Sequence, residues 1–575
     1  MKNFQSIFQI YPSYRTMFQF LLTTFLSFHF LTVKGETITE TASLKTKVPK
    51  PTVTVPADII PWLHTELSKA KRKTFLTKEE FFTKDSAKVV GFIKGYQPNL
   101  GFTTITLDAS NNLTRESKPM VSEIDSTGRF KCTIPMNHPC KATISFGEEF
   151  MSLYLEPGQT LAMVFDWKDC VKTDCFRELE DPAQVLLLQG PLARLNYELM
   201  TFQLKKLAYR HYWILEKYSP QAYLAVIDSI FVENDNCVKE ALKSGKYLKK
   251  AIEIQKNDAL ISNGYYLLDY ATYRDTGGIT LPKNFYNRLQ LIPLNDPSII
   301  ISDFYDRFIN RFEINPTMKK AYKIDAVKDV KNYECERVLN EWGRKDSLLK
   351  VDYKLLNSFA YEVTKTRSLS LAFQRMDKNE AYAYYFKLQK GITHPFLKQE
   401  GFRILKNRFG KNDMKSELGD GYIPLPSNSI KNPKWEALSL PDGKDADIFR
   451  ALIAPYKGKY LFVDFWGTSC GPCRWGIEEM KETRAKFNNS ADFEFIFISC
   501  KDWSPDKYKY DKYVKDQSLK QSYFISNDDF NYMMQLFRFK SLPHYLFIDP
   551  DGNVLDTDFE MYMEFDVARK WIQEK

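Results

Sequence analysis

The chain has 575 residues, of which 44% are hydrophobic and 15% aromatic, so it is too apolar to be intrinsically disordered and long enough for about three domains. Its formal net charge is +9, and the basic residues are interspersed with acidic ones, which argues against a nucleic-acid partner. We therefore expect several folded domains with a solvated, mildly basic surface.

The N-terminus carries an apolar run over residues 17–33, with Lys2 and Arg15 before it and no acidic residue within it. This pattern predicts a signal peptide over residues 1–35 that is cleaved during export. An uncleaved N-terminal membrane anchor is the alternative. Residues 36–85 are polar and contain several prolines, which predicts a lead-in or linker to the first domain.

Residues 86–183 show the two-residue period of β-strands and are predicted to form a β-rich domain of unknown function. The expected strands are Val89–Lys94, Phe102–Leu107, Arg129–Ile134, Lys141–Phe146, Met151–Glu156 and Thr160–Phe165. Turn signals such as Asp125–Gly128 separate these strands. Six short strands predict a small antiparallel sandwich or barrel. No catalytic constellation is visible in it.

Residues 184–427 are predicted to form a helical region. One apolar stripe at helical spacing contains Leu192, Leu195, Leu199 and Phe202. The aromatic cluster Tyr382–Phe386 is compatible with a ligand surface, but its helical spacing favours packing in a core. Glycines and prolines over residues 410–428 predict a linker to the last domain, residues 428–575.

The last domain is predicted to alternate strands and helices. The expected strands are Tyr460–Phe465, Phe493–Ser499, Gln521–Ile525, Tyr545–Ile548 and Asn553–Asp556, and the expected helices are Pro505–Gln517, Asp528–Phe537 and a last one from Glu564. Buried parallel-type strands alternating with helices indicate an α/β fold.

A Cys-Gly-Pro-Cys motif, Cys470 to Cys473, follows the strand Tyr460–Phe465 and opens a helical pattern. The start of a helix offers free N–H groups and a positive dipole end, which favour a thiolate. We therefore predict that Cys470 attacks a disulfide and that Cys473, which follows after two intervening residues and lies inside the helix, resolves the mixed disulfide. A structural disulfide or half of a zinc site are the alternatives, but zinc needs two more ligands, and none lies nearby.

The segment VDFWGTSCGPCRW resembles the active-site segment of the thioredoxin superfamily, and KSLPHYLFIDPDGNV resembles its companion segment. Together with the N-terminal features, these segments make the chain similar to the TlpA/ResA-type thiol–disulfide oxidoreductases of bacterial envelopes. The specific motifs cover about residues 428–575. The expected fold is multidomain, with a β-sandwich-like N-terminal domain, an α-helical middle region and a C-terminal α/β thioredoxin-like fold.

This resemblance implies an exported thiol–disulfide oxidoreductase in the periplasm or cell envelope. It implies that the enzyme reduces disulfides of envelope proteins and is recharged by a membrane-bound thiol–disulfide electron donor. No cofactor and no metal are expected. The alternative is an envelope binding protein whose thioredoxin-like domain is structural or latent. A peroxiredoxin is disfavoured because Thr468 forms T-x-C with Cys470, whereas a peroxiredoxin site requires T-x-x-C.

Two further site residues follow from the resemblance. It implies a cis peptide bond before Pro543, with this proline against the two cysteines, although most X-Pro bonds are trans. It also implies that Asp464 is the buried acid that accepts the proton of Cys473. Burial in an apolar strand should raise the pKa of Asp464 and make it a useful base, unless its side chain points to a loop. His544 either donates to a substrate backbone or is a solvated surface histidine.

The chain departs from the family pattern at two positions. Ser469 stands where a tryptophan usually precedes the first cysteine, which makes the surface there smaller and more polar. Glu478 stands where these helices often carry a kinking proline, so we expect a straighter helix.

The remaining cysteines give weaker predictions. In an oxidising compartment Cys132 could bridge Cys140, and Cys170 could bridge Cys175, but sequence alone leaves the pairing open. Cys237 and Cys335 are expected to be buried and inert. Cys500 ends a predicted strand of the last domain, and core packing is its expected role.

Overall fold

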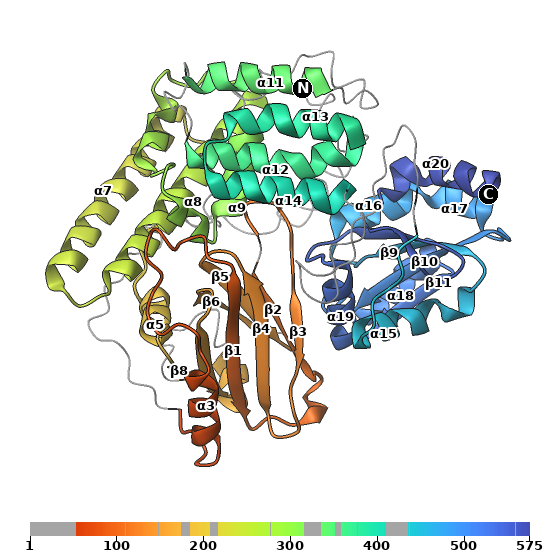
Figure 1. Ribbon diagram of the computed structural model, residues 1–575, viewed down its shortest axis with the longest axis horizontal. Helices are drawn as coiled ribbons and strands as arrows, with labels where there is room; N and C mark the ends of the chain where they lie inside the picture. The colour runs from red at the N-terminus through yellow and green to blue at the C-terminus, as the bar shows by residue number, and fades with distance from the viewer. Residues whose placement is uncertain are drawn as a thin grey trace, which may run out of the picture. The chain divides into compact units, whose positions relative to one another are not determined.

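The structure is a computed structural model of the chain. It describes residues 53–109, 111–147, 149–173, 185–207, 217–276, 278–314, 335–350, 358–376, 378–409, 435, 437–557 and 559–575. The predicted signal peptide, Cys175 and the predicted linker over 410–428 lie outside these residues. The chain divides into two compact units, whose described parts are residues 53–409 (the first unit) and 435–575 (the second unit) (Figure 1).

The first unit begins with two four-stranded sheets, ordered β4-β1-β7-β8 and β3-β2-β5-β6. The strands are β1 (Asp85–Lys94), β2 (Thr104–Asp108), β3 (Met120–Glu123), β4 (Arg129–Met136), β5 (Cys140–Phe146), β6 (Glu149–Leu155), β7 (Thr160–Asp166) and β8 (Leu186–Gln189). All six predicted strands are present, and β3 and β8 are additional. The prediction of a purely antiparallel sheet is wrong, because β1 and β7 pair in parallel.

Alternating burial explains why these segments form strands. In β4, Phe130, Cys132 and Ile134 are buried while the residues between them are exposed. The two sheets share one hydrophobic core, in which the rings of Phe146 (β5) and Phe165 (β7) stack with their centroids 4.7 Å apart. The β-rich character of the N-terminal part is confirmed, and its sandwich-like detail stays a prediction.

The predicted lead-in contains a helix, α3 (Ile59–Ser68), and is therefore not a linker throughout. Ile59 and Leu63 are buried against Val90 of β1 and Val164 of β7. The prolines and polar residues of this segment suggested a linker, but an apolar face of one helical turn is enough to attach the helix to the sheet.

Helices make up the rest of the first unit, which confirms the predicted helical middle region (Figure 1). They are α4 (Trp167–Thr173), α5 (Ala193–Thr201), α7 (Pro220–Ser244), α8 (Lys249–Thr276), η3 (Phe285–Leu291), η4 (Pro297–Ile301), α9 (Tyr305–Ile314), α11 (Cys335–Leu348), α12 (Phe359–Arg375), α13 (Lys378–Leu388), η7 (Gln389–Gly391) and α14 (Pro395–Phe409). Tyr384 and Tyr385 of the aromatic cluster are buried, as core packing requires. The boundaries proposed at residues 86, 184 and 428 stay predictions.

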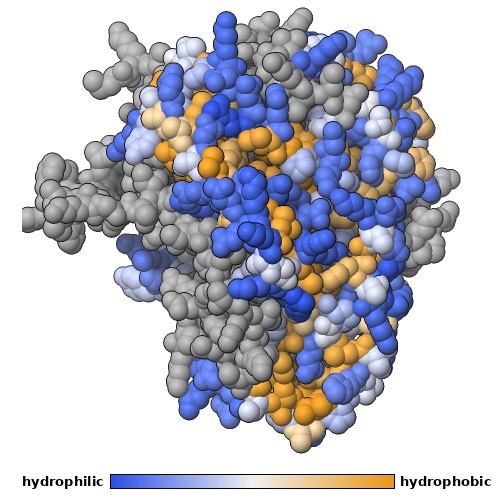
Figure 2. Space-filling model, turned by 90° about the vertical axis from the view of Figure 1, so that its left-hand side faces the viewer, coloured by the Kyte–Doolittle hydropathy of each residue, from blue (hydrophilic) through white to orange (hydrophobic). Residues whose placement is uncertain are grey.

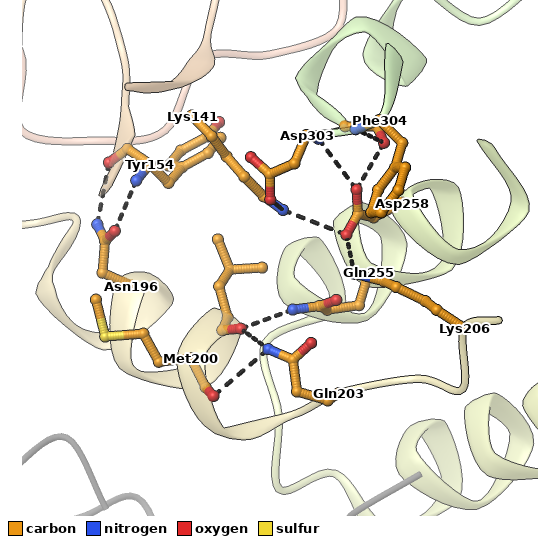
Figure 3. A network of polar contacts seen from close by, with 12 residues as sticks. Lys141, Tyr154, Asn196, Met200, Gln203, Lys206, Gln255, Asp258, Asp303 and Phe304 are labelled. Carbon is orange, nitrogen blue, oxygen red and sulfur yellow. Dashed lines mark hydrogen bonds and ion pairs between the residues drawn. The ribbon is translucent and has the colours of Figure 1, made fainter. Parts of the chain in front are cut away.

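A buried polar network ties the strands to the helices (Figure 3). The fully buried carboxylate of Asp258 in α8 accepts hydrogen bonds from Ser302 Oγ at 2.6 Å and from Lys206. It also lies 3.4 Å from Lys141 Nζ of β5. Burial opposes ionisation of Asp258, but the charges of Lys141 and Lys206 outweigh burial and lower its pKa. The network is therefore ionised at neutral pH.

Replacing Asp258 by alanine should destabilise the first unit by about 3–5 kcal/mol, because two lysines lose their buried counter-charge. A lowered pKa stabilises the fold above the ordinary aspartate pKa of about 3.9, and this contribution is lost as the pH falls. Urea unfolding at pH 7 and pH 3 measures both effects. Asp228→Ala is the control, because the partly exposed pair of Asp228 with Arg288 should contribute no more than about 1 kcal/mol.

The second unit contains a five-stranded sheet in the order β11-β10-β9-β12-β13. Its elements are α15 (Lys444–Ile453), η9 (Ala454–Tyr456), β9 (Tyr460–Phe465), α16 (Gly471–Glu479), α17 (Lys481–Phe487), β10 (Phe493–Cys500), α18 (Lys507–Asp516), β11 (Gln521–Ile525), α19 (Asn527–Phe537), β12 (His544–Ile548), β13 (Val554–Asp556) and α20 (Met561–Glu574). Strands β9, β10 and β11 are parallel, whereas β12 and β13 are antiparallel. Every predicted element of this part is present, and α15 is additional.

Figure 2 shows one face of the molecule, on which hydrophilic side chains cover much of the visible surface and hydrophobic ones gather near its lower end. Some large apolar side chains are exposed singly, such as Val232 and Leu242 of α7, which is ordinary for a folded protein. Over the part of the chain that the structure describes, no helix is both long enough and apolar enough to span a bilayer.

Candidate functional site

The two cysteines of the motif lie at the start of α16. Cys470 caps the helix, and its sulfur accepts a hydrogen bond from the backbone N–H of Cys473 at 3.1 Å. Pro472 lies in the first turn, where a missing N–H is harmless. Strand β9, a tight turn and a helix therefore bring both sulfurs to a helix N-terminus, as the sequence predicted.

Cys470 and Cys473 form a disulfide, with their Cα atoms 5.3 Å apart. Cys470 is 8% exposed and Cys473 is 0% exposed, so an approaching sulfur can reach only the first of the two. Among the described residues, no group of three or more histidine, cysteine, aspartate or glutamate side chains could hold a metal ion.

The turn before Cys470 is held by the segment that follows β10. Ser469 donates from its hydroxyl to the Trp503 carbonyl at 2.7 Å, and Ser504 Oγ accepts from the backbone N–H of Thr468 at 2.9 Å. A Cβ atom at Gly467 would lie 2.4 Å from the Trp503 carbonyl oxygen, so only glycine fits there. Ser469, at the position where the family usually has tryptophan, is thus an anchor of the turn.

The peptide bond between Leu542 and Pro543 is cis, as predicted. The next residue, His544, begins β12 and pairs with Phe465, the last residue of β9. Leu542 packs against the hydrophobic cluster that contains both cysteines. The proline segment and the cysteine motif therefore meet where β9 ends and β12 begins.

His544 is partly exposed, but its ring packs against the fold and does not stand free in solvent. Its ring stacks on Phe539 with the centroids 4.2 Å apart, and its Nε2 atom is buried without a hydrogen-bond partner among the described residues. Burial lowers the pKa of His544 to about 3, so the imidazole is neutral at physiological pH.

Asp464 is buried at 2% exposure, and its Oδ1 atom has no hydrogen-bond partner among the described residues. Burial raises the pKa of Asp464 well above the ordinary aspartate value, and the charge of Arg484 opposes that rise. Phe462, two residues earlier, packs in the cluster that contains the cysteines. Strand alternation places Asp464 on that same face of β9.

The prediction of a straighter helix after the motif is wrong, because the helix breaks at Met480 between α16 and α17. Arg484 explains how the break is tolerated. Its buried guanidinium donates to the Ile477 carbonyl at 2.5 Å and to the Gln517 carbonyl at 3.2 Å. A side chain that takes a helix carbonyl is one of the known causes of a kink. Arg484 therefore occupies an otherwise apolar helix face with both of its terminal guanidinium nitrogens hydrogen-bonded to backbone carbonyls.

The bridge between Cys132 and Cys140 that the sequence left open is absent, since both are buried free thiols. Cys170, Cys237 and Cys500 are also buried and free, whereas Cys335 has no described side chain. Burial raises the pKa of Cys132 to about 11 and that of Cys500 to about 12. Burial also raises the pKa of Cys237. Thiols that are hard to ionise are inert, which fits the roles predicted for Cys237 and Cys500.

A separate cavity of about 890 Å³ lies within the first unit, between the strands and the helices. Its lining combines apolar and charged side chains, among them Leu76, Phe81, Ile254, Ile292, Lys78, Glu253 and Asp296. Sequence reasoning did not find this cavity, because its lining comes from segments far apart in the chain.

Comparison with known proteins agrees with this geometry. Residues 458–554 match the family model described as thioredoxin-like. The thiol-disulfide oxidoreductase ResA of Bacillus cereus is 24% identical over 155 residues, which cover 27% of this chain and 76% of the relative. The second unit therefore belongs to the thioredoxin superfamily.

Two solved structures are also similar. The thioredoxin domain of a thiol-disulfide oxidoreductase from Bacteroides vulgatus is 20% identical, over 21% of this chain and 84% of that domain, with a TM-score of 0.19. A thiol:disulfide interchange protein of the thioredoxin family from Chlorobium tepidum is 23% identical, over 21% of this chain and 83% of that protein, with a TM-score of 0.19.

Proposed function

We propose that this protein is an exported thiol–disulfide oxidoreductase that reduces disulfides in proteins of the cell envelope. The class of enzyme follows from the thioredoxin-like match and the ResA relative. The observation that carries the proposal is the disulfide of Cys470 and Cys473 at a helix start, where Cys470 keeps 8% exposure and Cys473 has none. Export and the envelope location rest on the apolar N-terminal run.

The reaction begins with the reduced pair. The helix N-terminus stabilises the thiolate of Cys470, which attacks a sulfur of the substrate disulfide. The first substrate thiolate leaves, and a mixed disulfide remains on Cys470. Cys473 then loses its proton to Asp464, attacks the sulfur of Cys470 and releases the second substrate thiolate. Two electrons have passed to the substrate, and the enzyme holds the Cys470–Cys473 disulfide.

Pro543 and Leu542 are proposed to form the platform beside the reacting sulfurs, where an extended segment of the substrate lies. A membrane-bound thiol–disulfide electron donor would restore the two thiols. Cys470, Cys473, Asp464 and Pro543 are thus the proposed site residues.

An envelope binding protein with a latent thioredoxin-like unit is the second candidate. The cavity of about 890 Å³ favours it, because small-molecule sites have volumes of roughly 300–1,000 Å³ and often lie where structural layers meet.

Redox equilibrium with glutathione or dithiothreitol separates the two candidates. If the protein is a reductase, the Cys470–Cys473 pair should have a reduction potential of about −270 mV, and the protein should reduce insulin with dithiothreitol as electron donor. A pair with a potential below about −300 mV and no turnover of insulin would instead indicate a structural disulfide.

A further inference from the structure

Helix α16 has a glycine, Gly476, one turn after Cys473. Glycine inside a helix is unfavourable, because it loses more backbone freedom on folding than any other residue. A Cβ atom at this position would lie 2.8 Å from the hydroxyl oxygen of Tyr545. The space that a side chain at position 476 would fill is therefore occupied by the Tyr545 hydroxyl.

Tyr545 is also the residue opposite Asp464 in the antiparallel pair of β12 and β9. Directly opposed residues of such a pair project from the same face of the sheet, with their Cβ atoms close together. Tyr545 is 8% exposed and Asp464 is 2% exposed. Burial and the charge of the neighbouring Asp464 both raise the pKa of Tyr545.

The two side chains differ in length, which decides what each can reach. An aspartate carboxylate stays near its own strand, whereas the phenol ring of Tyr545 carries its hydroxyl up to the backbone of α16. Tyr545 therefore spans from β12, the strand next to the one that holds the buried acid, to the helix turn that follows Cys473. Tyr545, Cys470 and Cys473 belong to one hydrophobic cluster.

We propose that Tyr545 relays the proton of Cys473 to Asp464 during the resolving step, an inference that rests on the proposed function. The Cys473 thiol gives its proton to the Tyr545 oxygen while the Tyr545 proton moves to the Asp464 carboxylate. The Cys473 sulfur bonds to the sulfur of Cys470, and the bond from Cys470 to the substrate breaks. The substrate sulfur leaves with the electron pair and takes a proton from water.

Stability measurements test the geometry first. Gly476→Ala should lower the midpoint of thermal unfolding of the second unit, because the new methyl group meets the Tyr545 hydroxyl. In the background of Tyr545→Phe the same alanine should cost much less, since the hydroxyl is gone. Equal losses in both backgrounds would show that the hydroxyl does not occupy this space.

Single-turnover kinetics then test the relay. The reduced full-length protein is mixed with a disulfide-linked fluorescent peptide, and the mixed disulfide is followed by acid quenching and mass spectrometry. Tyr545→Phe should form the mixed disulfide at the normal rate. At pH 7 it should resolve the mixed disulfide about ten- to a hundredfold more slowly, whereas loss of a general acid or base typically slows a reaction by about a hundredfold or more. The solvent deuterium isotope effect on resolution should change as well, which a purely structural role would not produce.

Tyr460→Phe is the matched control, because Tyr460 lies at the other end of β9 on the same face and packs against Phe547. It should leave both steps unchanged. If the unmodified protein forms no mixed disulfide, the proposed function fails. If the unmodified protein resolves its mixed disulfide and Tyr545→Phe does so equally fast from pH 6 to pH 9, the relay is wrong and the proposed function stands.

Discussion

Replacing Cys470 by serine is expected to abolish the reduction of disulfide substrates, with a loss of more than about a thousandfold, as for other essential nucleophiles. The reason is that Cys470 is the partly exposed residue of the pair, whereas Cys473 is fully enclosed. Cys473→Ser should still attack and should then accumulate the mixed disulfide, because the resolving thiol is missing. Non-reducing electrophoresis and mass spectrometry detect the trapped adduct.

Cys500→Ser is the control for this pair of variants, since Cys500 is a buried free thiol at the end of β10. It should trap nothing and keep normal turnover. Adducts that appear with Cys470→Ser and not with Cys473→Ser would reverse the assigned roles.

Asp464→Asn is expected to leave formation of the mixed disulfide nearly normal and to slow its resolution by about a hundredfold or more, because an amide cannot accept the Cys473 proton. Burial raises the pKa of Asp464, so the wild-type carboxylate should gain activity in resolution as the pH rises from 6 to 9. The variant should lose this dependence. Resolution rates that match those of the wild type across this range would exclude Asp464 as the base.

The same carboxylate should influence stability. A raised pKa means that ionisation is unfavourable in the folded state, so the second unit loses stability as the pH rises above the unfolded aspartate value of about 3.9. Asp464→Asn should therefore be more stable than the wild type at pH 8, because the amide does not ionise, by about 1.4 kcal/mol for each unit by which folding raises the pKa of Asp464. Asp551→Asn, at an exposed turn position, is the control and should change nothing.

The strands and helices that were predicted correctly can be recognised from the residues within each element. Strands such as β4 show alternating burial along their own length, and the motif that opens α16 is four consecutive residues. β3 and β8 have only four residues each, too few for a clear period. The parallel pairing of β1 with β7 depends on residues about seventy positions apart, which no local pattern encodes.

The same distinction applies to the site. Cys470, Cys473 and Pro543 were found from their motifs. Trp503 and Tyr545 were not, because their contribution depends on where a neighbouring strand or loop places them. Arg484 was noticed as a charge on an apolar face, but only the observed break in the helix explains what it does.

The free thiols buried in both units set a condition on how the protein is made. Five cysteines, Cys132, Cys140, Cys170, Cys237 and Cys500, are protected from oxidants only by the folded core around them. In the newly made chain they are as accessible as the active pair, so an oxidant that arrives early can join sulfurs that never meet in the native protein. Folding and oxidation therefore compete. If both hydrophobic cores form before oxidation, the five buried thiols are protected and Cys470 forms its disulfide with Cys473.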